Sequence, residues 1–182
     1  MRRRISCTLL LFVTVIGCAL GRVEHGPATD VPEMLKQFPG YHVVTRAERS
    51  ADASAYLLRH YSRTNPSVVR ADFDGDGHPD YALLLKHDGS PNAKFVVLLC
   101  SDAAQCRTVY ELDVTASIAE MYLTPVPQES RVSPTGAIDR SDDSAGVKLQ
   151  GVGIQLNYFE KAAVVYYWSK RTKRIEAIET ED

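Results

Sequence analysis

The pattern of hydrophobic and polar residues changes from helical to strand-like about a third of the way along the chain. Val31–Phe38 has a helical period, with Asp30 placed to cap its start and Pro39 to end it. Tyr41–Thr45 predicts a short strand. Ala51–Tyr61 again has a helical period, and its apolar stripe consists of Ala55, Leu57, Leu58 and Tyr61. The N-terminal part is therefore expected to contribute one or two helices.

From Val68 onward the apolar residues follow the patterns of β-strands. Strands are expected over residues 68–73, 81–86, 94–100, 107–114, 118–123, 152–157, 162–168 and 174–178. Because no helical period separates these strands, antiparallel neighbours are favoured over a parallel, doubly wound sheet. The expected fold class is α+β, mainly antiparallel β, arranged as a meander or a propeller-like sheet with one or two N-terminal helices.

The N-terminus has the pattern of an export signal. A basic start, Met1–Arg4, precedes the apolar stretch Leu9–Ile16, which is too short to span a bilayer. The following residues up to Cys18 resemble a bacterial lipobox, and this resemblance implies that Cys18 is lipidated. Ala19 after the cysteine implies sorting to the outer membrane, so we expect a periplasmic protein anchored there by its lipid. Ordinary signal cleavage after Ala19 stays open as the alternative.

These features divide the chain of 182 residues into three parts. Residues 1–17 are expected to be the signal peptide, 18–30 a lipid-anchored tether, and 31–182 a single β-rich domain. The formal net charge of −2 argues against nucleic acid as a partner. The polar segment Ser133–Gly146 is expected to be a long exposed loop.

The four cysteines leave one pair within the expected domain. Cys7 would leave with the signal peptide and Cys18 would carry the lipid, so Cys100 and Cys106 remain. They lie between two strand-like segments, and a disulfide across a hairpin loop fits the oxidising periplasm. A redox-active pair is the alternative, but the spacing is not C-x-x-C and no helix start follows.

One short loop concentrates four carboxylates between two expected strands. Aspartates occupy positions 1, 3, 5 and 9 of the segment 72–80, and Gly77 permits a sharp turn. Hard oxygen ligands at alternate positions suit Ca²⁺, and the backbone carbonyl of His78 supplies a further oxygen. We predict one structural Ca²⁺ bound by Asp72, Asp74, Asp76, Asp80 and the carbonyl of His78. An Asp/Gly-rich turn without metal is the alternative.

This loop is not an EF-hand, because Leu83 stands where a bidentate glutamate belongs and a strand follows instead of a helix. The strand–loop–strand pattern of residues 70–84 resembles the calcium loops of FG-GAP and VCBS repeats. The resemblance implies a structural role for the calcium. Only one such loop occurs and no fixed period repeats, so a propeller built from several repeats is not supported.

The sequence lacks the usual catalytic motifs, including H-E-x-x-H, G-x-S-x-G and the phosphate-binding G-x-x-x-x-G-K-[ST]. Carboxylates such as Glu111, Asp113 and Glu120 could form a glycosidase-like pair in space. The aromatic run Tyr166–Trp168 could stack on sugar rings, although alternation along a strand should bury at least one of the rings. We expect the protein not to be an enzyme.

The layout as a whole carries a second resemblance. A lipobox, an Asp-rich loop, a disulfide hairpin and a closing strand pair that contains Val164–Trp168 are similar to those of small bacterial envelope lipoproteins. Among these are calcium-binding immunity lipoproteins that inhibit peptidoglycan hydrolases of neighbouring bacteria. The resemblance implies a protein-binding module whose partner is an envelope-targeting hydrolase, with the loop Ser133–Gly146 as a candidate contact surface. A carbohydrate- or peptidoglycan-binding envelope protein is the alternative.

Overall fold

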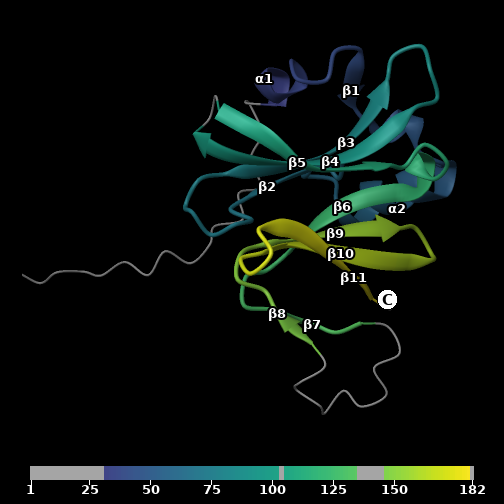
Figure 1. Ribbon diagram of the computed structural model, residues 1–182. Coiled ribbons are helices and arrows are strands. Elements are labelled where there is room, and N and C mark those ends of the chain that lie inside the picture. The colour runs from purple at the N-terminus through teal and green to yellow at the C-terminus, as the bar shows by residue number, and fades with distance from the viewer. Residues whose placement is uncertain (1–30, 103–104, 135–145, 181–182) are drawn as a thin grey trace, which may run out of the picture.

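Two antiparallel sheets packed face to face form the body of the protein in the computed structural model, which describes residues 31–102, 105–134 and 146–180 (Figure 1). The first sheet has the order β1-β3-β4-β5, and β2 also pairs with β3. Its strands are β1 (Tyr41–Val43), β2 (Val68–Ala71), β3 (Asp80–His87), β4 (Ala93–Asp102) and β5 (Gln105–Asp113). The short strands β1 and β2 pair with opposite halves of β3.

The second sheet has the order β11-β10-β9-β6 and lies below the first in Figure 1. Its strands are β6 (Met121–Val126), β9 (Gly153–Tyr158), β10 (Ala162–Ser169) and β11 (Arg174–Thr180). A separate small ladder joins β7 (Arg131–Val132) to β8 (Val147–Lys148). The prediction of a mainly antiparallel β fold is confirmed, whereas the strands form open sheets and no propeller is observed among the described residues.

Short helices precede or interrupt the strands. They are α1 (Val31–Leu35), η1 (Arg46–Glu48), α2 (Ala51–His60) and η2 (Ile118–Glu120). α1 ends earlier than predicted, because tighter turns replace the α-helix after Leu35. In the last of these turns, the backbone N–H of Phe38 donates to the carbonyl of Leu35. Ser50 caps α2 by accepting from the backbone N–H of Ala53. The strand expected over 118–123 begins instead with the helical turn η2.

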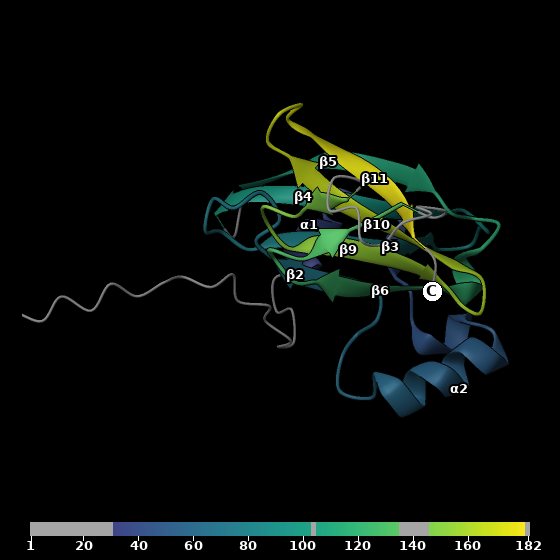
Figure 2. The same ribbon diagram turned by 90° about the horizontal axis from the view of Figure 1, so that it is seen from below.

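The predicted apolar stripe of α2 is wrong in part. Leu57 is fully buried, but Leu58 is 56% exposed. The helix lies at one end of the second sheet, beside β6 (Figure 2). It packs there through Leu57, Ala53 and the ring of Tyr56, which lies 5.9 Å from that of Tyr122 on β6. The face of α2 toward the protein is therefore turned relative to the one expected.

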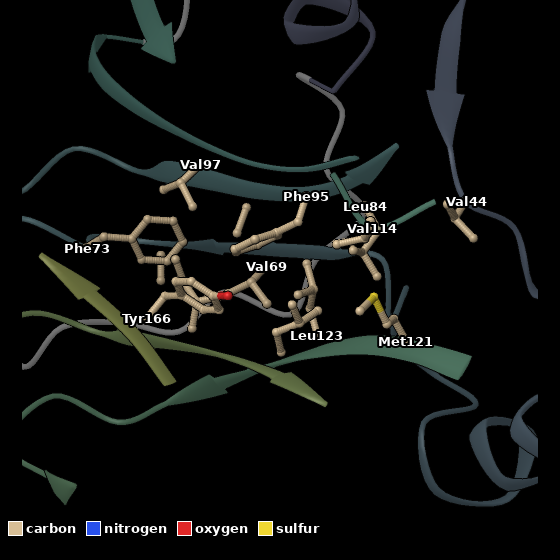
Figure 3. Packing of buried hydrophobic residues seen from close by; sticks show 14 of the residues in the cluster. Val44, Val69, Phe73, Leu84, Phe95, Val97, Val114, Met121, Leu123 and Tyr166 are labelled. Atoms are coloured by element: carbon tan, nitrogen blue, oxygen red, sulfur yellow. The ribbon is translucent and has the colours of Figure 1, made fainter. Parts of the chain in front are cut away.

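The main core fills the space between the two sheets (Figure 3). Phe95 on β4 and Tyr166 on β10 meet there with ring centroids 4.9 Å apart. β3 and β4 are buried on both faces, because the outer face of the first sheet packs against α1 and the turn after it. This double burial explains the continuous apolar run in β3. Because the Asp-rich loop leads directly into β3, the loop begins at the edge of the core.

Several predicted segments lie outside the described residues. These are the signal peptide, the tether with Cys18, and residues 135–145 of the Ser133–Gly146 loop. Within the described part of the chain, no helix has the length and apolar character needed to cross a membrane.

Candidate metal centre

Three of the predicted ligands come together at the junction of β2 and β3. Ligand oxygens of Asp72, Asp74 and Asp80 all lie within 4.8 Å of one another. β2 and β3 pair up to Ala71 opposite Asp80, so the loop 72–79 begins and ends at neighbouring points. The antiparallel pairing of β2 with β3 therefore brings the first and ninth positions of the Asp-rich segment to one place.

Asp72 organises the loop from its first position. Its Oδ1 accepts from the backbone N–H of Gly75 at 2.6 Å and of Asp76 at 3.1 Å, and its Oδ2 accepts from Gly77 at 2.9 Å. Both Gly75 and Gly77 have positive φ, at 79° and 91°, where a side chain would be strained. These glycines let the backbone curl around the Asp72 carboxylate.

Asp80 is the buried member of the group, with no exposed surface. Its Oδ2 accepts from the backbone N–H of Phe73 at 2.8 Å, and its Oδ1 accepts from that of Cys100 at 2.9 Å. Burial raises the pKa of Asp80 to about 7, although these two hydrogen bonds oppose the shift. A neighbouring cation is the partner that compensates for burying such a carboxylate.

Asp74 is half-buried and lies close to the other carboxylates of the group. Burial raises its pKa, and so do the charges of Asp76 and Asp72, whereas Lys170 has the opposite effect. The structure thus places three mutually repelling carboxylates in one small volume, together with one ammonium group nearby.

Asp76 and His78 are the two predicted ligands whose side chains do not join this group. Asp76 is exposed, and its Oδ1 accepts from the backbone N–H of His78 at 2.7 Å. Asp76 does not belong to the group of carboxylates that lies within reach of one ion. Its role as a ligand, and that of the His78 carbonyl, stay predictions.

The second sheet supports the loop through contacts that sequence reasoning missed. The backbone N–H of Val152 donates to the carbonyl of Asp72 at 3.0 Å. A Cβ on Gly75 would lie 3.1 Å from Nζ of Lys170, in the turn between β10 and β11. Lys170 lies in the hairpin turn that joins β10 to β11, and its position beside the Asp-rich loop follows from packing of the sheets and has no signal in the sequence.

A disulfide closes the adjacent hairpin. Cys100 on β4 and Cys106 on β5 are directly paired in register and bonded through their sulfurs. The pairing is the one predicted from the sequence. Between this hairpin and the Asp-rich loop lies an open cavity of about 430 Å³, lined on one side by Asp74 and Asp76 and on the other by Ser101, Gln105 and Arg107.

The donor set fits a hard divalent cation. Calcium binds oxygens at about 2.3–2.6 Å, so two ligands of one ion can be as much as about 5 Å apart, and the three carboxylates satisfy this limit. Each carboxylate oxygen has more than one lone pair, so an oxygen that already accepts an N–H can also coordinate a metal. Bound calcium would neutralise the repelling charges and join the start of β3 to the end of β2.

The other residues considered from the sequence are engaged elsewhere. Tyr166 and Trp168 are buried in the core, at 4% and 9% exposure, so they are not available to stack on a sugar. Glu111 pairs with Lys94 at 2.8 Å, and Glu120 accepts from the hydroxyl of Ser50. These contacts give the two carboxylates structural partners.

Comparison with known proteins adds no further constraint. No protein-family model, no curated protein and no solved structure matches this chain.

Proposed function

We propose that this protein is an exported binding domain braced by calcium. The observation that carries the proposal is the convergence of Asp72, Asp74 and the fully buried Asp80 where β2 passes into β3. The adjacent disulfide and the support from the second sheet stiffen the same end of the molecule. A rigid scaffold presents its loops with little ordering entropy to lose on binding, which favours recognition of a partner.

The first experiment tests the metal. Thermal unfolding of the purified domain is measured in calcium, in magnesium and in chelator. Calcium should raise the melting temperature, and magnesium should do so less, because its tight octahedral geometry suits this type of site poorly. Identical melting in calcium and in chelator would show that the loop is an Asp/Gly turn without metal.

We further propose that the partner is a peptidoglycan hydrolase and that the domain inhibits it. Support comes from the similarity in layout to immunity lipoproteins and from the open cavity beside the Asp-rich loop. The side chains that line this cavity include charges of both signs, Asp76 and Arg107, which favours a polar protein surface over an apolar ligand. The carbohydrate-binding alternative has less support, since two of its three candidate aromatic side chains, Tyr166 and Trp168, are buried.

The partner is tested by capture from envelope extract, followed by turbidity measurements of peptidoglycan lysis with and without the domain. Inhibition of a captured hydrolase supports the proposal. Binding to purified peptidoglycan without any effect on lysis would favour the carbohydrate-binding alternative, and lysis by the domain alone would show an enzyme.

Lipid anchoring at Cys18 belongs to the same proposal. Mass analysis of membrane-extracted protein should show acyl chains on Cys18, and Cys18→Ser should release a folded protein from the membrane. A soluble product that begins at Leu20 would indicate ordinary signal cleavage instead.

A further inference from the structure

The disulfide hairpin and the Asp-rich loop share one buried carboxylate. Asp80 accepts from Cys100 through Oδ1 and from Phe73 through Oδ2, at 2.9 and 2.8 Å. The ladder between β3 and β4 reaches its last pair at Tyr81 and Leu98. Cys100 lies two residues beyond this pair, so the Asp80 carboxylate continues the contact between the strands after the ladder ends.

The disulfide reinforces the end of a short regular stretch of the ladder. Cys100 and Cys106 form the last of three regular pairs that lie between two irregularities in the pairing of β4 with β5, so beyond Cys100 the ladder gives no regular support. On the other side of the disulfide, the carbonyl of Cys106 accepts from the side chain of Gln37 at 3.1 Å. The disulfide therefore links Cys100 covalently to β5 and, through the hydrogen bond of Cys106 with Gln37, to the segment after α1.

We propose that the Cys100–Cys106 disulfide is a redox-sensitive control of the Asp-rich loop, acting through Asp80. When the bond is closed, the amide of Cys100 is held on Asp80 and the loop carboxylates stay together. When the bond is open, the hairpin end loosens, Asp80 loses a donor, and the loop opens more often. A lower affinity for calcium then follows. The statement about affinity rests on the proposed function, whereas the statement about the loop does not.

A dithiol reductant opens the bond by thiol–disulfide exchange. Its thiolate attacks Sγ of Cys106, which is partly exposed, whereas Cys100 is 2% exposed. The S–S electron pair leaves on Sγ of Cys100, which takes up a proton. The second thiol of the reductant then displaces Cys106 as a thiol. The protein gains two electrons and two protons, and the reductant becomes a disulfide.

The test is hydrogen exchange followed by mass spectrometry, on metal-free protein in its oxidised and dithiothreitol-reduced forms. Reduction should increase the rate of hydrogen exchange in the peptide Phe73–Pro79 by about fivefold or more. A factor of about five is the lower end of the range that coupled sites commonly show. The peptide Gly153–Ser169 in the second sheet serves as internal control and should not change. The double variant Cys100→Ser/Cys106→Ser should reproduce the reduced form, and Asp80→Asn should remove the response to reduction.

Calcium titrations of both forms provide an independent readout. Calcium should bind the reduced form about fivefold or more weakly, and by reciprocity it should make the disulfide harder to reduce by the same factor. Unchanged exchange in Phe73–Pro79 would overturn the proposal, and so would faster exchange in both peptides, since that indicates loss of the whole fold. Altered loop exchange without calcium binding in either form would support control of the loop and overturn the calcium function alone.

Discussion

Gly151 lies so close to Phe73 that a Cβ on the glycine would be 2.1 Å from the carbonyl oxygen of Phe73. This contact places the turn before β9, in the second sheet, against the backbone of the Asp-rich loop. The neighbouring hydrogen bond from Val152 to Asp72 holds the same two segments together. The loop is thus positioned by both sheets.

Gly151→Ala is expected to destabilise the protein by about 3 kcal/mol, the upper end of overpacking effects, because the added methyl group meets backbone that cannot rotate away. Urea unfolding measures the loss. Gly89→Ala is the control: Gly89 has a φ of 72° and open space around it, so only backbone strain of about 1 kcal/mol should appear. Equal costs for the two variants would contradict this role of Gly151.

Asp74 and Asp76 should differ in their contribution to the metal site. In calcium at a hundredfold excess over Kd, bound metal stabilises by about 2.7 kcal/mol, which corresponds to roughly 5–10 °C in melting temperature. Asp74→Asn should remove this gain. Asp76→Asn should retain most of it, because Asp76 lies outside the group of converging carboxylates. Melting curves with calcium and with chelator check both variants. If both variants lose the calcium-dependent gain in melting temperature to the same extent, Asp76 is an essential ligand.

His42 should make stability depend on pH. Its Nδ1 lies 2.7 Å from Asp88 and its Nε2 lies 3.0 Å from both oxygens of Glu48. Burial alone lowers the pKa of His42, but these two carboxylates outweigh it and raise the pKa above the ordinary 6.5. The stabilisation is therefore complete below about pH 6.5 and is lost as the pH rises through the raised pKa of the folded state.

His42→Gln tests this dependence by urea unfolding at several pH values. At low pH the free energy of unfolding of the wild type should exceed that of the variant by about 1 kcal/mol or less, because His42 and its two carboxylate partners are partly solvated. This difference should shrink above neutral pH. Asp88→Asn should reduce the same pH dependence, because it removes one of the two carboxylates. A pH profile that is the same in wild type and His42→Gln would rule out this role.

Arg49 carries a buried charge that is only partly hydrogen-bonded. Its guanidinium donates to the hydroxyl of Ser67, but Nε and Nη1 are buried without a hydrogen-bond partner in the described part of the chain. Burial lowers the pKa of Arg49 to about 10. Arg49→Met fills the same space without a charge and should be neutral or stabilise by about 1 kcal/mol.

Two companion variants sharpen the Arg49 test. Arg49→Ala should destabilise by about 2 kcal/mol because it leaves a cavity. Arg59→Met on the exposed side of α2 should change little. Strong destabilisation by Arg49→Met would show that the guanidinium has partners essential to the fold.

The elements that could be predicted from the sequence are those with local causes. Alternate aspartates with glycines between them mark the Asp-rich loop, and the unbroken run Tyr81–Leu85 marks a strand buried on both faces. The cysteine pair follows from its spacing and from the expectation that the protein is exported. The contacts of Lys170 and Gly151 with the Asp-rich loop could not be predicted, because they depend on how the two sheets pack. The exposure of Leu58 likewise depends on the direction from which α2 meets β6.

The pairing of β6 with β9 has a consequence for the order of folding. β3, β4 and β5 follow one another along the chain and close as successive hairpins, as do β9, β10 and β11. β6 instead finds its partner across the long connection 127–152, so this ladder carries the largest loop-closure entropy in the second sheet. The hairpins are expected to form early and the β6–β9 pair late. The last contacts to form would include those of Gly151 and Val152 with the Asp-rich loop, so the candidate metal centre is completed only near the end of folding.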